Sequence, residues 1–149
     1  MSKCYALSGL RVAYIVSQKS NYLRKYIPPW SVSLPAQLAA ISALNNPDYY
    51  QNKYRIIHFE REKLSQGLTD IGFKVFPGVA NFLLTTLPID SNYSSSSFIT
   101  ESRNLGLFVR DAENMGVTLT NKSVRFAIRS SEENNRMLSL VRKIIMKDQ

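Results

Sequence analysis

The last part of the chain places a strand pattern directly before a helix pattern, and this junction most limits the folds available. Residues 123–128 alternate between apolar side chains and polar or small ones, as in a strand with one buried face. Ser130 and Glu133, three residues apart, match a capping box, which predicts that a helix begins there. That helix has an apolar stripe: Met137, Leu138, Val141, Ile144 and Ile145. The junction therefore predicts a sheet with a helix packed on one of its faces.

Further strands and helices are expected upstream of this junction. Strands are predicted at residues 10–16, 73–76, 80–87 and 107–110, and helices at residues 18–26, 35–45, 48–70 and 96–104. The element order predicts an α+β fold. The strand at 10–16 stands apart from the others in the sequence, and the backbone of a strand needs a pairing partner. We therefore expect it to belong to a sheet that this chain does not contain.

Composition and charge narrow the class of protein. The chain is 44% hydrophobic and 20% charged, as in ordinary globular proteins, and no apolar run is long enough for a membrane span. One cysteine (Cys4) and one histidine (His58) predict no disulfide and no metal site, and with no secretory signal we expect a cytoplasmic location. The net charge of +8 is spread along the chain, which favours anionic small ligands over nucleic acid as partners.

A spaced pattern near the N-terminus carries candidate chemistry. Lys3 offers an amine that can attach to an aldehyde, and Ser2 and Arg11 offer donors for a phosphate. Gly9 is expected to allow a close turn that returns Arg11 toward the same pocket. Taken alone, Lys3 would be a frayed terminal lysine and Arg11 a surface arginine.

The pattern in residues 2–14 nevertheless closely resembles the lysine segment of enzymes of the aminotransferase class that depend on pyridoxal 5'-phosphate. The resemblance implies this cofactor, with Lys3 as the catalytic lysine that forms the Schiff base. It also implies Ser2 and Arg11 as ligands of the cofactor phosphate.

A second segment distinguishes two families within that class. Residues 28–32, with Trp30 followed by Ser31, resemble threonine-phosphate decarboxylases of cobalamin biosynthesis, whereas histidinol-phosphate aminotransferases usually carry a Tyr-Asn pair there. Without the resemblance, this segment is a hydrophobic linker whose tryptophan packs in the core. Asn81 matches both families, and its alternative interpretation is a turn residue before a strand. The resemblance implies that Trp30 and Asn81 bind substrate.

Three arginines are candidates for binding an anionic substrate. Read as a strand, the segment 124–129 places Arg125 and Arg129 on its polar face, with Cα atoms about 13 Å apart, and the two could bracket one dianion. Taken alone, two such arginines favour a solvated strand face. The resemblance implies that Arg125 grips a substrate carboxylate, that Arg129 assists, and that Arg110 is a further substrate ligand. We therefore expect a phosphorylated amino acid as substrate.

The resemblance also implies a domain organisation and a ranking of functions. Residues 1–33 would be a remnant of the large cofactor-binding domain, residues 34–70 the interdomain helices and residues 71–149 the C-terminal small domain. L-threonine O-3-phosphate decarboxylase is the first expectation, and histidinol-phosphate aminotransferase or a related class I/II enzyme is the alternative. A non-catalytic binding module is a second alternative. We expect a homodimer, and we expect this chain alone to be inactive, because the family's remaining cofactor ligands have no counterpart in it.

Overall fold

The structure is a computed structural model that describes residues 1–148 of the chain. Its internal contacts divide the chain into two compact units. The first unit spans Met1–Tyr54 and the second begins at Arg55, within the long helix α3 (Pro47–Asp70).

The first unit is mostly helical and has a small core. Its elements are η1 (Ser8–Leu10), α1 (Ser20–Leu23), η2 (Arg24–Tyr26), α2 (Leu34–Leu44) and the start of α3. Buried Val12, Ala36 and Ala40 form the core, with Met1, Leu7 and Val32 packed against them. The predicted helix at 18–26 forms as a short α-helix continued by a 3₁₀ turn.

The two longer helices of this region are confirmed close to their predicted bounds. At the start of α2, the Ser33 hydroxyl accepts a hydrogen bond from the Ala36 N–H at 3.4 Å, and Pro35 occupies the first turn. A proline is tolerated there because that turn has no intrahelical partner for its N–H. The helix predicted at 48–70 is α3, which begins one residue earlier, at Pro47.

The strand predicted at residues 10–16 is not formed. Only Val12 of this segment is buried, and Ile15 and Val16 are 73% and 89% exposed. Among residues 1–148 no strand pairs with it, so its backbone groups lack the ladder that a strand requires. The β-branched residues of this segment are typical of a strand, but composition alone does not supply a second strand to pair with.

The second unit contains one antiparallel sheet of four short strands. They are β1 (Lys74–Val75), β2 (Phe82–Thr86), β3 (Arg110–Asp111) and β4 (Ser123–Ala127), in the spatial order β1-β2-β4-β3. β4 is central, with β2 on one side and β3 on the other. The strand predicted at 107–110 is observed as β3, shifted toward the C-terminus.

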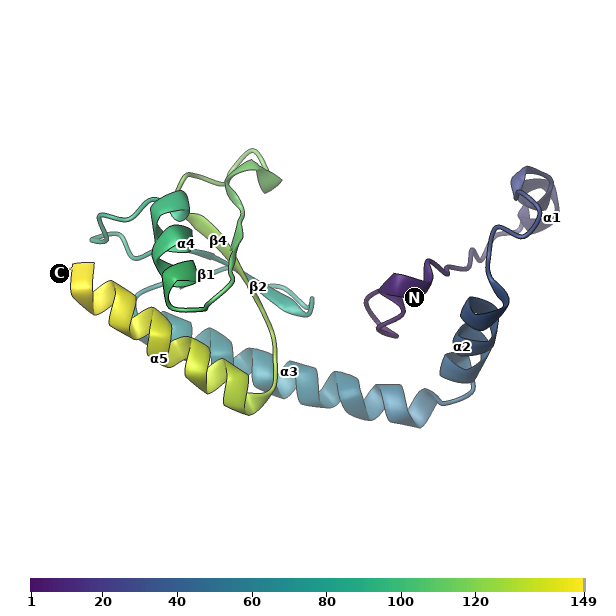
Figure 1. The fold of residues 1–149 in the computed structure, drawn as a ribbon, viewed down its shortest axis with the longest axis horizontal. Helices are drawn as coiled ribbons and strands as arrows, with labels where there is room; N and C mark the ends of the chain where they lie inside the picture. The colour runs from purple at the N-terminus through teal and green to yellow at the C-terminus, as the bar shows by residue number, and fades with distance from the viewer. Residues whose placement is uncertain (149) are drawn as a thin grey trace. The chain divides into compact units, whose positions relative to one another are not determined.

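Helices cover one face of this sheet, and the core lies between them (Figure 1). The second half of α3 runs beside α5 (Ser131–Asp148), and α4 (Ser95–Asn104) packs against α5. Buried members of this core come from all three helices and the sheet: Leu64, Leu68, Leu83, Phe98, Val124, Phe126, Val141 and Ile144. The Phe126 ring makes edge contacts with Phe73 and Phe98, at centroid distances of 5.8 and 6.4 Å. The predicted α+β arrangement is therefore observed, and among the described residues of the second unit no helix packs on the other, free face of the sheet.

Helix α4 begins with a capping box that the sequence analysis missed. The Ser94 hydroxyl accepts from the Ser97 N–H, and the Ser97 hydroxyl accepts in turn from the Ser94 N–H.

Within residues 1–148, no helix has the length and apolar character needed to cross a membrane. The same residues hold no group of three acidic, histidine or cysteine side chains placed to bind a metal ion.

Candidate functional site

Two arginines face each other across the edge of the sheet. Arg110 of β3 is directly opposite Arg125 of β4, so both side chains leave the same face. Residues opposite each other in an antiparallel pair have Cα atoms only about 4.5–5.5 Å apart. Like charges at such positions destabilise a sheet. Among residues 1–148 neither arginine forms a salt bridge, so the pair presents two uncompensated positive charges to an incoming anion.

The free face of the sheet also carries an aromatic ring beside Arg125. The guanidinium carbon of Arg125 lies 4.8 Å from the centroid of the Phe82 ring. Phe82 is opposite Ala127 and Leu84 is opposite Arg125, so the ring and the guanidinium are diagonal neighbours. Arg125 is half-buried and Arg110 is exposed. The site is thus an arginine pair in which one member rests on an aromatic face.

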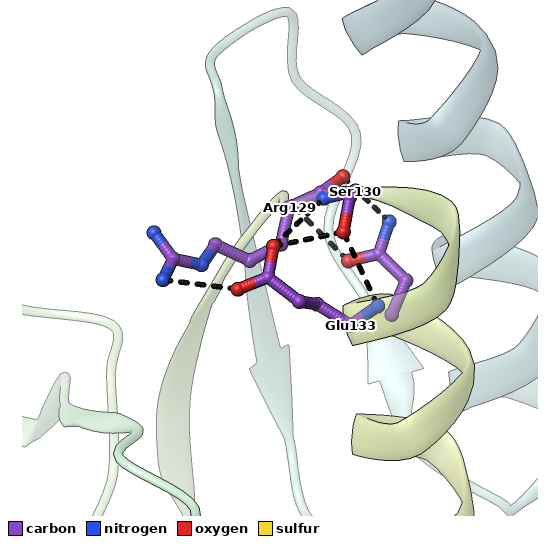
Figure 2. Close-up of polar contacts among 4 residues, drawn as sticks. Arg129, Ser130 and Glu133 are labelled. Atoms are coloured by element: carbon purple, nitrogen blue, oxygen red, sulfur yellow. Dashed lines mark hydrogen bonds and ion pairs between the residues drawn. The ribbon is translucent and has the colours of Figure 1, made fainter.

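Arg129 lies just beyond the end of β4 and is engaged in its own contacts (Figure 2). Its Nη2 is 3.3 Å from Glu133 Oε1, and the two side chains are 59% and 53% exposed. The predicted capping box is confirmed: the Glu133 N–H donates to the Ser130 hydroxyl, and the Ser130 N–H and hydroxyl both donate to Glu133 Oε2. These bonds from Ser130, and then the charge of Arg129, hold the pKa of Glu133 below its ordinary value.

A buried asparagine fixes the backbone at this junction, and the sequence analysis did not identify it. Asn134 is 2% exposed. Its Oδ1 accepts from the Arg129 N–H at 3.0 Å, and its Nδ2 donates to the Arg129 carbonyl at 3.0 Å and to Glu60 Oε2 at 3.1 Å. The sequence signal that could have identified Asn134 is its amide side chain, one position after Glu133 of the capping box.

The predicted strand alternation is confirmed, but the arginine placed opposite Arg125 is Arg110. Val124 and Phe126 are fully buried and Arg125 points away from them. The strand ends at Ala127, so Arg129 does not continue it. The Arg129 guanidinium contacts the Glu133 carboxylate instead. The expectation that Arg125 and Arg129 bracket one dianion along a single strand therefore has less geometric support than an Arg110–Arg125 pair.

The candidate cofactor residues lie in the first unit, near the N-terminus. The Lys3 side chain is exposed and Ser2 is half-buried. The Arg11 side chain folds back onto the preceding turn, where its Nη1 donates to the Ser8 carbonyl at 3.1 Å. Gly9 lies within this turn, in η1, and Arg11, which ends η1, adopts the left-handed conformation with a φ of 53°.

This donor set fits a cofactor that carries an aldehyde and a phosphate. An exposed amine at Lys3 is accessible for covalent attachment. The guanidinium of Arg11 and the hydroxyl of Ser2 are the donor types that bind phosphate. The chemistry of the residues is thus compatible with pyridoxal 5'-phosphate, and their individual roles stay predictions.

Trp30 and Asn81 lie in different units. Trp30 is 98% exposed and has a φ of 54°, in a turn closed by a bond from the Ser31 N–H to the Pro28 carbonyl at 3.3 Å. The alternative interpretation of Trp30 as a tryptophan packed in the core is therefore wrong. Asn81 is exposed at the start of β2, and its carbonyl accepts from the Ile128 N–H at 3.1 Å. Asn81 is therefore held at the end of β4 that leads to Arg129.

Comparisons with known proteins assign this arrangement to one family. The family model described as aminotransferase class I and II matches residues 1–141. A histidinol-phosphate aminotransferase 2 from Archaeoglobus fulgidus is 32% identical over 146 residues, which cover 96% of this chain and 40% of the relative. The chain therefore spans about two fifths of the length of the curated relatives that it matches over nearly all of its residues.

Solved structures agree on the fold. A histidinol-phosphate aminotransferase from Clostridium acetobutylicum has a TM-score of 0.88 at 26% identity, covering 99% of this chain and 44% of that one. One from Sinorhizobium meliloti, in complex with pyridoxal 5'-phosphate, has a TM-score of 0.84 at 23% identity, covering 98% and 39%. An L-threonine-O-3-phosphate decarboxylase from Porphyromonas gingivalis has a TM-score of 0.76 at 21% identity, covering 97% and 45%. The expected fold is confirmed.

Proposed function

The chain belongs to the aminotransferase class I and II family, and from this premise we propose that it supplies the lysine segment and the small domain of a pyridoxal-phosphate enzyme. Residues 1–33 would belong to the large domain, residues 34–70 to the interdomain helices and residues 71–149 to the small domain. We expect the complete enzyme to be a homodimer. We expect the 149-residue chain alone to show no turnover, since the relatives that it matches are more than twice as long.

Amino transfer from histidinol phosphate is our first candidate reaction. The observation that supports it is the directly opposed pair of Arg110 and Arg125, whose two guanidinium groups can both bind one phosphate group. A phosphate monoester carries nearly two charges and three acceptor oxygens, and arginine forks match that geometry. Histidinol phosphate has one such group and no carboxylate, so a single clamp suffices. The sequence alone places the decarboxylase first; the ion pair of Arg129 with Glu133 and the similarity to histidinol-phosphate aminotransferases favour amino transfer instead.

In this proposal the chain's own residues divide the work between binding and proton transfer. Arg11 and Ser2 hold the cofactor phosphate, and Lys3 anchors the cofactor. The bound cofactor supplies an electron sink for the substrate Cα. The freed Nζ of Lys3 then moves a proton at that Cα. Arg110 and Arg125 orient the substrate through its phosphate.

Decarboxylation of L-threonine O-3-phosphate is the second candidate. Trp30 followed by Ser31 favours it, as does a third arginine, Arg129, near the end of β4. A substrate with both a carboxylate and a phosphate needs more than one cationic clamp. This reaction would require Arg129 to leave Glu133 and turn toward the substrate.

A chimaeric enzyme tests the proposal. The matched 40% of the Archaeoglobus fulgidus relative would be replaced by this chain. Histidinol phosphate with 2-oxoglutarate, and threonine phosphate, would be supplied separately, while glutamate formation and CO₂ release are measured. We expect glutamate formation that is lost with Lys3→Ala. The Arg125→Ala variant should lose about 30- to 1,000-fold in kcat/KM, equivalent to about 2–4 kcal/mol, as expected for a desolvated charged partner.

Three outcomes discriminate between the alternatives. CO₂ release from threonine phosphate without amino transfer would select the second candidate. A folded chimaera that takes up the cofactor but acts on neither substrate would contradict both reactions. Persistence of the covalent cofactor adduct after Lys3→Ala would contradict the assignment of Lys3. A chimaera containing Lys25→Ala serves as the matched control for loss of a lysine in the first unit.

A further inference from the structure

The contact between Arg125 and Phe82 differs in kind from an ion pair. The two residues come from neighbouring strands, and the guanidinium carbon lies 4.8 Å from the ring centroid. An aromatic ring attracts a cation to its face and engages none of the guanidinium N–H donors as a carboxylate would. The ring therefore holds Arg125 while its hydrogen-bonding edge stays available.

Arg110 makes such a restraint necessary. It stands directly opposite Arg125, and the two positive charges repel each other. Among residues 1–148 no carboxylate forms a salt bridge with either side chain. Without a restraint, a long flexible arginine would swing away from its like-charged neighbour, and an anion would have to order it again on binding.

We infer that Phe82 is a positioning residue, which holds the Arg125 guanidinium beside Arg110 so that both can bind one oxyanion. The inference rests on the proposed function, because that proposal supplies the anion: the phosphate of the substrate. The location of Phe82 fits this role. It is half-buried on the free face of the sheet, opposite the face that α4 and α5 cover, so its ring is not committed to the core.

Another cation–aromatic contact of the chain provides the matched control. The Lys63 ammonium lies 4.3 Å from the centroid of the Phe59 ring. These two residues are one turn apart on α3, so the contact is local. Phe59 is 55% exposed and lies outside the sheet. Replacing it removes an aromatic ring of the same size next to a cation, but leaves the arginine pair unchanged.

The test titrates inorganic phosphate into this 149-residue chain with ¹⁵N-labelled arginine, at constant ionic strength set with sodium chloride. The Arg125 side-chain signal is assigned from its absence in Arg125→Lys. In the unliganded chain, we expect the Arg125 Hε signal to be shifted upfield by the Phe82 ring. Phosphate should perturb the Arg110 and Arg125 signals together. Phe82→Leu should weaken that binding about three- to tenfold, which corresponds to about 0.7–1.4 kcal/mol.

The outcomes separate this inference from the proposed function. Phe82→Tyr, which keeps the ring, should bind phosphate like the unmodified chain, and so should Phe59→Leu. Equal phosphate affinity in Phe82→Leu and the unmodified chain, with the β2–β4 amide signals retained, overturns the inference alone. An unshifted Arg125 Hε signal in the unmodified chain overturns it even if Phe82→Leu does not fold. Absence of any phosphate effect on Arg110 and Arg125 counts against the proposed function itself.

Discussion

Replacing Asn134 with alanine removes a side chain that ties three parts of the second unit together. Asn134 lies in the first turn of α5 and bonds both backbone groups of Arg129 after β4. It also donates to Glu60 on α3. Asn134 and Glu60 are only 2% and 7% exposed, so water cannot readily replace the lost bonds. We therefore expect a large loss of stability from a substitution that removes few atoms.

The magnitude follows from the three bonds. Each bond to the Arg129 backbone contributes about 1 kcal/mol net, and a bond to a charged partner such as Glu60 about 1.5–3 kcal/mol. The two Arg129 bonds are only partly buried, which lowers their share. Alanine also has the higher helix propensity, by roughly 0.5 kcal/mol. The expected net loss in the free energy of unfolding is about 2–4 kcal/mol.

Native-state hydrogen exchange of the β2 and β4 amides measures this loss in the second unit alone. A circular dichroism melt would average it with the helices of the first unit. Asn135→Ala is the matched control, because Asn135 is exposed on the same helix turn. It should be neutral or stabilising by up to about 0.7 kcal/mol. A loss in Asn134→Ala of less than about 1 kcal/mol relative to this control would refute the reasoning.

Three further predictions concern the same unit. Phe126→Ala should cost about 3–5 kcal/mol, because the ring is fully buried between other aromatic rings, whereas Phe108→Ala, at a residue 80% exposed, should be nearly neutral in urea unfolding. Gly72→Ala should cost about 1–2 kcal/mol, since Gly72 has a φ of 100°, while Gly9→Ala, at a residue without positive φ, should change the urea midpoint little. Glu133 has a lowered pKa, so it stabilises the start of α5 above its ordinary pKa of 4.5, and this stabilisation is lost as pH falls through its folded pKa. Amide exchange at the α5 start should show that loss, and Glu133→Gln should remove most of the pH dependence.

Elements with local signals could be predicted from the sequence. The start of α5 depends on Ser130 and Glu133, which are three residues apart, and the observed bonds match the expected capping box. The start of α2 likewise depends on Ser33 and a proline in the first turn. Both motifs satisfy backbone donors within one turn, so no distant residue is needed to form them.

Elements that depend on distant partners could not be predicted in the same way. Residues 10–16 have the composition of a strand, but a strand forms only where another backbone pairs with it. In the sequence, Asn134 looks like an ordinary polar helix residue. Only the folded structure shows that its side chain bonds to Glu60 and to the Arg129 backbone.

The arginine site shows why strand alternation alone does not identify the cation nearest to Arg125 in the sheet. Alternation compares residues along one strand, so it paired Arg125 with Arg129, at a separation of about 13 Å. Strand pairing brings opposed residues within about 5.5 Å, which places Arg110 much closer to Arg125. The pairing continues one residue past β3: the Ala112 N–H donates to the Ser123 carbonyl at 3.0 Å, and the Ala112 side chain is fully buried. The close pair of cations therefore depends on the β3–β4 register, which a pattern along β4 alone does not contain.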